Sequence, residues 1–251
     1  MNTPQFEQAV DILARARKGV VLTGAGISID SGIPPFRGKG GLWEKIDPME
    51  YASIQAFLKD PAAVWNVLIK DMKQVLATAL PNAGHTGLAD LENLGIIQSV
   101  ITQNVDGLHQ AAGNTDVIEF HGNFFWQRCQ TCDEKIETTQ VALTEIPPRC
   151  VCGGMLRPDC VFFGEMIPET ALRRSYQIAA ACDVMLVVGT SATVQPASSM
   201  PVIARENGAA VIELNTDPTP LTRTISTLSL MGRSSVILPE LVAAIRKKKS
   251  A

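Results

Sequence analysis

This sequence has little of three things: long apolar runs, clustered basic residues and the features of a secretory signal at its start. The first residues lack the basic start and apolar stretch of a signal peptide, and no segment is apolar enough to span a bilayer. We therefore expect a cytoplasmic protein with no membrane partner. Lys and Arg gather only at residues 246–249, and the formal net charge is -3. Because binding to phosphates requires clustered positive charge, we expect no nucleic-acid partner.

Internal repeats and low-complexity segments are also lacking. With 46% hydrophobic residues among 251, the chain can bury a large core, and one large domain with a smaller insertion is the natural division. Short apolar runs predict strands at residues 19–23, 96–102, 117–120, 184–188, 210–214 and 227–230. Apolar periodicity and capping residues predict helices at residues 4–17, 61–79, 85–93, 169–181 and 199–207, and from about Pro239.

Strands that alternate with helices indicate an α/β fold with a doubly wound parallel sheet, in which ligands bind at the carboxyl ends of the strands. The first strand runs into Gly24-Ala25-Gly26, a turn that lets the backbone approach a pyrophosphate. The dinucleotide fingerprint needs a third Gly where this chain has Ile29, so an ordinary dehydrogenase is a poor fit. A Gly- and Pro-rich stretch at residues 31–41 then predicts a long loop that closes over a ligand.

Candidate ligand-binding residues, either glycines or polar residues, follow the ends of several predicted strands. If those strands are neighbours, the residues line one crevice. The segments are Gly24 to Gly26, Gln103 to Asp106, His121, Gly189 to Ser191, and Asn215 to Asp217.

Four cysteines form two close pairs, Cys129-x-x-Cys132 and Cys150-x-Cys152. Two turns that each supply two thiolates are typical of a tetrahedral zinc site. Unrelated buried thiols fit the paired spacing poorly, and a redox site would need only one C-x-x-C. We predict structural zinc, since four thiolates fill the coordination shell and leave no position for a catalytic water. The unpaired Cys160 is predicted to be a buried thiol, as is Cys182.

The chain has three histidines. His85 falls near a predicted helix start and His109 follows a predicted ligand loop, so both are expected to pack or to brace a loop. His121 ends a strand and precedes a Gly. That position at the ligand edge sets it apart from the other two histidines.

Taken together, these motifs closely resemble the sirtuins, which are NAD-dependent protein-lysine deacylases. The resemblance covers almost the whole chain, in the family's order. Besides the four cysteines it rests on Gly24-Ala25-Gly26-Ile27-Ser28, Ser31-Gly32-Ile33-Pro34-x-Phe36-Arg37, Thr102-Gln103-Asn104-Val105-Asp106-Gly107-Leu108-His109, Phe120-His121-Gly122, Phe163-Gly164-Glu165, Gly189-Thr190-Ser191, Val194-Gln195-Pro196-Ala197 and Asn215.

The resemblance implies a Rossmann-like NAD-binding domain and a small domain made of two insertions. The large domain would comprise residues 1–33, 81–123 and 161–251. The cofactor loop and a helical insertion would occupy residues 34–80, and the zinc-binding insertion residues 124–160.

The implied reaction begins when the acyl oxygen of the substrate attacks the ribose carbon that carries nicotinamide. Nicotinamide leaves and an alkylimidate forms, which a ribose hydroxyl attacks; water then releases free lysine and leaves the acyl group as an ester of ADP-ribose. His121 is implied to be the general base that activates a ribose hydroxyl, because an imidazole pKa of about 6.5 suits proton transfer near neutrality. Gln103 and Asn104 would lie near the ribose and the attacking oxygen and complete the implied catalytic set.

Further roles follow from the same resemblance. NAD, consumed as co-substrate, is implied to contact Gly24, Ala25, Gly26, Ile33, Phe36, Arg37, Gln103, Asn104, Val105, Asp106, Gly189, Thr190, Ser191 and Asn215. The implied zinc ligands are Cys129, Cys132, Cys150 and Cys152. An acetylated lysine peptide or protein would bind as an added strand along Val161, Phe162, Phe163, Gly164 and Val194. We expect a monomer.

Two positions depart from the sirtuin pattern. Pro35 stands where many sirtuins have Asp, which stiffens the loop and removes a polar contact. Relatives that remove succinyl or malonyl groups carry Tyr and Arg where this chain has Leu68 and Asp71, so we expect acetyl or apolar acyl groups. Two rival functions stay open: mono-ADP-ribosyl transfer at the same site, and a non-catalytic NAD-binding or zinc interaction module.

Overall fold

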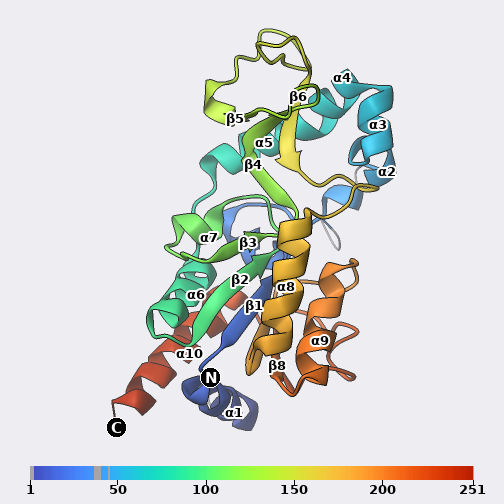
Figure 1. Cartoon of the computed structure of the whole chain (residues 1–251). Coiled ribbons are helices and arrows are strands. Elements are labelled where there is room, and N and C mark those ends of the chain that lie inside the picture. The colour runs from blue at the N-terminus through green and yellow to red at the C-terminus, as the bar shows by residue number, and fades with distance from the viewer. Residues whose placement is uncertain (1–2, 37–40, 45, 251) are drawn as a thin grey trace.

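The structure is a computed structural model that describes residues 3–36, 41–44 and 46–250. A large body is built on a six-stranded sheet, and a smaller body lies above it in Figure 1. All pairings in the large sheet are parallel, in the order β3-β2-β1-β7-β8-β9, so the predicted α/β fold is confirmed. The strands are β1 (Gly19–Thr23), β2 (Ile97–Thr102), β3 (Val117–Glu119), β7 (Val184–Val188), β8 (Ala210–Asn215) and β9 (Leu228–Met231).

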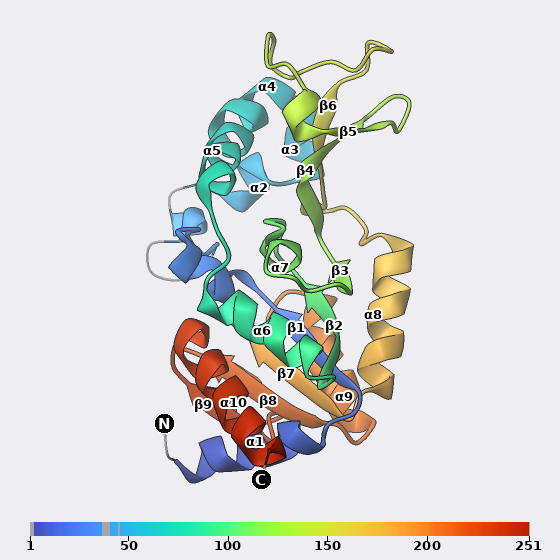
Figure 2. The same ribbon diagram turned by 90° about the vertical axis from the view of Figure 1, so that its left-hand side faces the viewer.

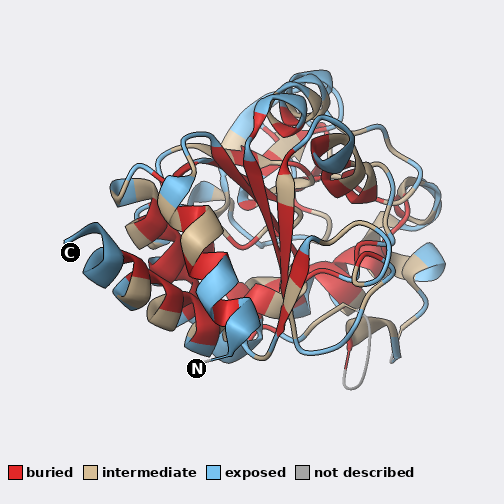
Figure 3. Ribbon diagram, turned by 90° about the horizontal axis from the view of Figure 1, so that it is seen from below, coloured by how far each residue is buried: buried red, intermediate tan, exposed pale blue. Residues whose placement is uncertain are grey.

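Helices cover both faces of this sheet, because its strands are apolar on both faces. Val21 faces one apolar cluster together with α1, α6 and α10, whereas Val20 and Leu22 face another with α8 and α9. Figure 3 shows the buried strands between these exposed helix surfaces. The five helices are α1 (Pro4–Arg15), α6 (Ala83–Asn93), α8 (Glu169–Ala181), α9 (Met200–Glu206) and α10 (Ser234–Lys249).

One of the predicted helix starts is confirmed and another is wrong. Thr3 caps α1 as expected: its hydroxyl oxygen accepts a hydrogen bond from the Phe6 amide at 3.2 Å. The predicted start of the last helix at Pro239 is wrong, since α10 begins at Ser234 and contains that proline. Apolar residues on both sides of Pro239 are buried, and Leu238 packs close against Gly87 of α6. This packing outweighs the one hydrogen bond that proline removes.

The helical part of the smaller body spans residues 48–78. It comprises α2 (Pro48–Tyr51), α3 (Ile54–Lys59), α4 (Pro61–Val64), a π-helical turn at Trp65–Ile69 and α5 (Lys70–Thr78). The single regular helix predicted over residues 61–79 is thus interrupted by a wider turn. Trp65 lies in that turn, and its indole N–H donates to the Leu156 carbonyl at 3.1 Å. The bond fastens the helical part to the second sheet.

The second sheet is antiparallel, with the order β5-β4-β6. Its strands are β4 (Gly122–Cys129), β5 (Lys135–Glu137) and β6 (Leu156–Cys160), and Figure 2 shows it beside α2–α5. The sequence predicted no strands here, since these runs are partly polar and show no strict apolar alternation. Among the described residues, no helix is long and apolar enough to cross a membrane.

Candidate functional site

The carboxyl ends of the central strands lie in register at one edge of the sheet. Thr23, the last residue of β1, pairs with Thr102 of β2 and with Val188 of β7. Val188 pairs in turn with Leu214 of β8. The turns that follow these strands therefore meet at one edge, as predicted. β1 is flanked by β2 and β7, so the strand order reverses beside it, which is where open α/β sheets bind ligands.

The glycine turn after β1 packs directly against the turn after β7. The Gly26 amide donates to the Gly189 carbonyl at 2.8 Å, and a Cβ added to Gly26 would lie 2.7 Å from that residue's backbone. Gly189 has φ +60°, and its own added Cβ would lie 2.4 Å from the Ile27 amide nitrogen. Close backbone contact between the turns thus requires glycine here. The segment that follows, Ala25–Ser31, is a 3₁₀ helix of 7 residues.

The segment Gln103–Asp106 forms a dense polar network behind this turn. Gln103 donates to the Thr190 hydroxyl at 3.0 Å, and Asn104 donates to the Gly24 carbonyl at 3.2 Å. Asn104 and Asp106 are both buried. Asp106 accepts the Leu108 amide at 3.0 Å, and its second oxygen accepts the Ser28 hydroxyl at 2.7 Å. The network fixes polar side chains that burial would otherwise penalise.

Ser28 is a central residue that the sequence analysis did not select as a site residue. Its side chain is buried, donates to Asp106 and accepts from Asn104 at 3.1 Å. His85 lies 3.4 Å from the same hydroxyl. The place of Ser28 directly after the glycine turn could have identified it, since that turn was already assigned to the ligand edge.

The two other histidines are buried beneath this network, as expected of packing residues. Asn82 donates its amide to His85 Nδ1 at 3.3 Å, which completes a capping box at the start of α6. His109 lies 2.9 Å from the Thr23 hydroxyl. Burial lowers the pKa of His85 to about 4 and that of His109 to about 3, so both rings are neutral at pH 7.

His121 lies between β3 and β4, next to the end of β2. Its Nδ1 is 3.0 Å from the Gln103 carbonyl oxygen. A carbonyl oxygen can only accept, so Nδ1 carries the hydrogen, and in the neutral ring Nε2 keeps a free lone pair. Burial lowers the pKa of His121, although the bond to Gln103 opposes the shift. The ring is therefore neutral at pH 7 and can accept a proton at Nε2.

The cofactor loop is described only in part. Phe36 stacks on Trp43 with ring centroids 5.3 Å apart, and Trp43 contacts Phe163 edge-on at 6.2 Å. Ile33 is buried in the same apolar cluster. Arg37, predicted to contact NAD, lies outside the described residues. Phe36 and Phe163, predicted for cofactor and peptide, are thus linked through one ring.

The predicted peptide-binding segment runs beside His121. The Val161 amide donates to the His121 carbonyl at 2.8 Å. Phe163 exchanges backbone bonds with the helical part: its amide donates to Ala52, and its carbonyl accepts from Ile54. In the other predicted peptide-binding segment Ala192 has φ +51°, and the Val194 carbonyl accepts from the Ser198 amide. Residues 161–164 directly follow β6, and residues 193–195 follow the turn after β7.

The remaining predicted cofactor residues lie at the ends of β7 and β8. Asn215 donates its side-chain N–H to the Thr190 carbonyl at 2.8 Å. Ser191 is exposed, and its hydroxyl lies 3.0 Å from that of Thr193. Ala25 and Val105 are partly buried at the same edge. The predicted NAD contacts at residues 24–26, 103–106, 189–191 and 215 thus lie in or beside the turns at the carboxyl edge of the sheet, whereas Ile33 and Phe36 pack in the apolar cluster of the small body.

The four paired cysteines come together beside the second sheet: Cys129 ends β4, and the other three lie in the turns between the strands. Their sulfur atoms all lie within 4.8 Å of one another, with Cys129 and Cys152 3.5 Å apart and Cys132 and Cys150 3.8 Å apart. Zn–S bonds of about 2.3 Å in a tetrahedron place sulfurs roughly 3.8 Å apart, so this donor set fits a tetrahedral metal. Gly154 lets the backbone lie close to the sulfur atoms, since an added Cβ would lie 2.5 Å from Cys129 Sγ.

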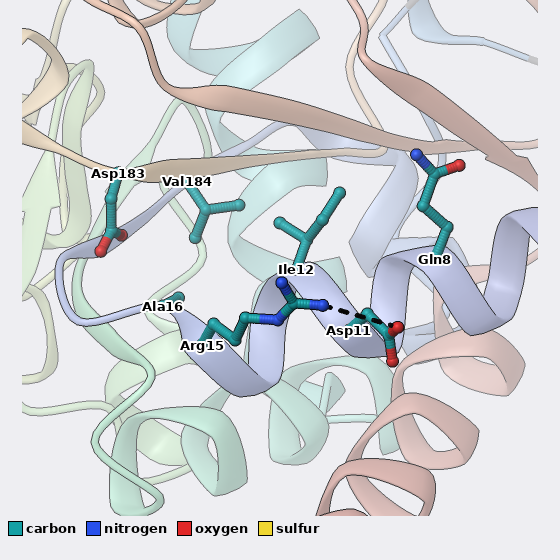
Figure 4. A pocket seen from close by; sticks show the side chains of 7 residues that line it. All are labelled: Gln8, Asp11, Ile12, Arg15, Ala16, Asp183 and Val184. Atoms are coloured by element: carbon teal, nitrogen blue, oxygen red, sulfur yellow. Dashed lines mark ion pairs between the residues drawn. The ribbon is translucent and has the colours of Figure 1, made fainter.

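The two other cysteines are buried, as predicted. Burial raises the pKa of Cys160 to about 12 and that of Cys182 to about 11, so neither is a nucleophile at pH 7. A separate cavity of about 420 Å³ lies at the opposite end of the sheet, between α1 and the start of β7 (Figure 4). Its lining is Gln8, Asp11, Ile12, Arg15, Ala16, Asp183 and Val184, none of which was predicted as a site residue.

The fold and the carboxyl edge of the large sheet define a nucleotide-binding α/β protein with a separate cysteine module, which is the second sheet with its turns at residues 122–160. The model of the Sir2 family matches residues 24–196. A protein named NAD-dependent protein deacylase 2, from Pyrobaculum aerophilum, is 46% identical over 95% of this chain and 95% of its own length. The NAD-dependent protein deacylase of Aquifex aeolicus is 48% identical over 91% and 95%. The chain belongs to the Sir2 family, the sirtuins.

Solved structures agree with this assignment. A Sir2 homologue in complex with NAD is 44% identical, covers 96% of this chain and 94% of its own, and superposes with a TM-score of 0.89. A Sir2 protein bound to a myristoylated histone peptide is 34% identical over 98% of both chains, with a TM-score of 0.81. The resemblance inferred from the motifs is therefore confirmed over nearly the whole chain.

Proposed function

We propose that this chain is an NAD-dependent protein-lysine deacetylase that transfers the acyl group to ADP-ribose and releases nicotinamide. The observation that carries the proposal is the geometry of His121. Its Nδ1–H is held by the Gln103 carbonyl, which leaves Nε2 free to take the proton of a ribose hydroxyl. Full-length similarity to NAD-dependent protein deacylases supports the same reaction.

The residues around His121 bind and orient the substrates in this proposal. Asp106 and the Val105 backbone hold the nicotinamide carboxamide, while Gln103 and Asn104 lie near the ribose and the attacking acyl oxygen. Phe36 shields the reactive carbon once nicotinamide has left. The glycine turn with Ile33, Arg37, Gly189, Thr190, Ser191 and Asn215 contacts the rest of the dinucleotide.

The acyl-lysine peptide binds as an added strand between segments 161–164 and 193–195, with Phe162, Gly164 and Val194 along its path. Acetyl is the preferred acyl group. Leu68 is buried in the apolar cluster of the small body, whereas Asp71 is exposed, so no positive charge is supplied there for a succinyl or malonyl group. A relative that binds a myristoylated peptide makes longer apolar chains a second class to test.

Zinc on Cys129, Cys132, Cys150 and Cys152 would hold the second sheet together and supply no catalytic water. The domain division at residues 34–80 and 124–160 belongs to the same proposal. So do a monomeric state, a cytoplasmic location and the lack of a nucleic-acid partner.

The test is to incubate enzyme, NAD and an acetyl-lysine peptide and to follow every product by mass spectrometry. We expect loss of acetyl from the peptide and formation of nicotinamide and acetylated ADP-ribose in equal amounts. Gain of ADP-ribose on protein, with acetyl retained, would instead identify a mono-ADP-ribosyltransferase. NAD left intact alongside an intact peptide would indicate a non-catalytic module.

A further inference from the structure

A buried ion pair stands at the boundary between the cysteine module and the predicted peptide-binding segment. Arg157 of β6 binds Glu165 with both terminal nitrogens, at 2.9 and 2.7 Å. The side chains are only 10% and 21% exposed. Two parallel bonds between planar groups fix distance and orientation more tightly than a single contact can.

Glu165 uses the same carboxylate to close a turn in the main chain. One of its oxygens accepts the Phe162 amide at 2.8 Å, and its own amide donates to the Phe162 carbonyl at 3.0 Å. Gly164, with φ +87°, lies inside this turn. The carboxylate therefore holds the backbone of residues 162–165 in one shape.

Arg157 fixes where that turn lies. Its guanidinium carbon is 4.7 Å from the centre of the Phe162 ring, and that ring packs edge-on against Phe57 at 5.8 Å. Arg157 also sits on β6, in register with Arg128 of β4. The turn is thus joined to the cysteine module on one side and to the helical part on the other.

A buried ion pair such as the one between Arg157 and Glu165 adds little to the net stability of the fold. Removing two charges from water offsets most of their attraction, and a packed apolar pair often stabilises a fold equally well. Arg157 Nε moreover has no hydrogen-bond partner in the described part of the chain, which adds a cost. What the pair does provide is orientation of the segment that continues from Val161, whose amide is bonded to the His121 carbonyl.

We propose that Arg157 and Glu165 are positioning residues for the acyl-lysine peptide. They hold the backbone of residues 161–164 in the orientation that pairs with the added substrate strand, and so align the acyl group relative to His121. The inference rests on the proposed function, because it takes this segment as the peptide site. Neither residue touches the reacting atoms.

The test compares Arg157→Lys and Glu165→Gln with the control Arg128→Lys. Lysine cannot form the two parallel bonds, and glutamine keeps the size of glutamate without its charge. Arg128 pairs with Asp159 at 2.8 Å in the same sheet, and within the described part of the chain it forms no hydrogen bond or ion pair with residues 162–165. For each protein we would measure the Kd of a fluorescent acetyl-lysine peptide, the Kd of ADP-ribose, and kcat and KM for the peptide.

We expect peptide affinity to fall in both variants, and kcat/KM for the peptide to fall by up to about 100-fold, the loss of rate that a small misplacement can cause, with ADP-ribose affinity unchanged. The control should match the wild type for both ligands. Peptide affinity that stays at the wild-type value overturns the positioning role, and so does an equal loss for both ligands or a variant that no longer binds ADP-ribose. A wild-type protein that binds no acetylated peptide overturns the proposed function as well, which separates the two failures.

Discussion

The cysteine module and the carboxyl edge of the large sheet are held together by different forces. Around the cysteines the buried apolar residues are Cys129, Cys150 and Leu156, with Ile136 and Val141 packed partly against them. The large sheet instead lies between two extensive apolar clusters. The module thus has only a small apolar cluster beside four sulfur atoms that could hold a metal, whereas the sheet edge is held by packing and a buried polar network.

This difference assigns separate tasks to the two regions. Four thiolates can fix a fold but leave no coordination position for a substrate. The sheet edge presents His121 Nε2, amide side chains and close-packed turns, which can bind and move a proton. We infer that chemistry takes place at the sheet edge and that the cysteine module supports the peptide segment.

Removing the metal should have the largest effect. Binding free energy at such sites is folding free energy, about 10 to 16 kcal/mol in zinc-finger peptides, so a chelator should unfold the module and abolish deacetylation. Hydrogen exchange should become fast in β4–β6 while β1 and β7 stay protected. A metal-free protein that keeps slow hydrogen exchange in β4 and full activity would contradict the view that the cysteine module, unlike the sheet edge, needs a metal to stay folded.

Replacing His121→Ala should lower kcat about 10²-fold to 10⁴-fold, the usual contribution of a positioned acid–base group. The side chain is half-buried, and its Nε2 has no hydrogen-bond partner among the described residues, so the melting temperature and the Kd of ADP-ribose should change little. Steady-state kinetics and calorimetry on the same preparation provide the check. Turnover close to the wild-type value would exclude His121 as the base.

The Gly26→Ala variant tests whether the two turns must touch. The added methyl would lie 2.7 Å from the Gly189 backbone, and such overpacking costs about 1–3 kcal/mol. We expect a higher KM for NAD besides lower stability. Gly208→Ala is the matched control, since Gly208 has φ +92° and open space around it, so this change should cost stability alone. Equal KM values in the two variants would show that the turn contact does not matter for NAD.

The buried His85 and His109 should make the free energy of unfolding depend on pH. Their pKa values are about 4 and about 3 when folded, against about 6.5 in an unfolded chain. Between these limits the unfolded chain binds more protons, so stability should be full above pH 6.5. It should decline below that, with the last part lost near pH 3. Urea unfolding from pH 8 to pH 4 measures this, and a flat profile would contradict the neutral buried state.

Sequence alone could locate the cysteine site because its ligands are close along the chain. Spacing also predicted the parallel sheet, since apolar strands alternate with amphipathic helices. The polar edge of the large sheet was harder to predict, because Gln103 and Gly189 are far apart in sequence and only the strand order brings their turns together. Ser28 was missed because no local pattern shows that a buried hydroxyl bridges Asn104 and Asp106.

Other features depended on tertiary contacts that no local pattern carries. The π-helical turn at Trp65–Ile69 interrupts a sequence with regular helical periodicity. The start of α10 at Ser234 depends on packing against Gly87 of α6, which overrides the usual effect of Pro239. In the second sheet β5 and β6 are short, and the cysteines lie at the end of β4 and in the turns between the strands. In each case packing between segments decided the local structure.

Metal exchange tests the division of labour between the two regions most directly. The enzyme would be prepared with zinc and with Co²⁺ on its four cysteines, and kcat for the acetyl-lysine peptide would be measured per molecule of folded protein. If the metal only holds the module, kcat should be the same with both ions. A kcat that changes with the ion, at equal stability and equal peptide affinity, would contradict a purely structural metal and move part of the chemistry to the cysteines.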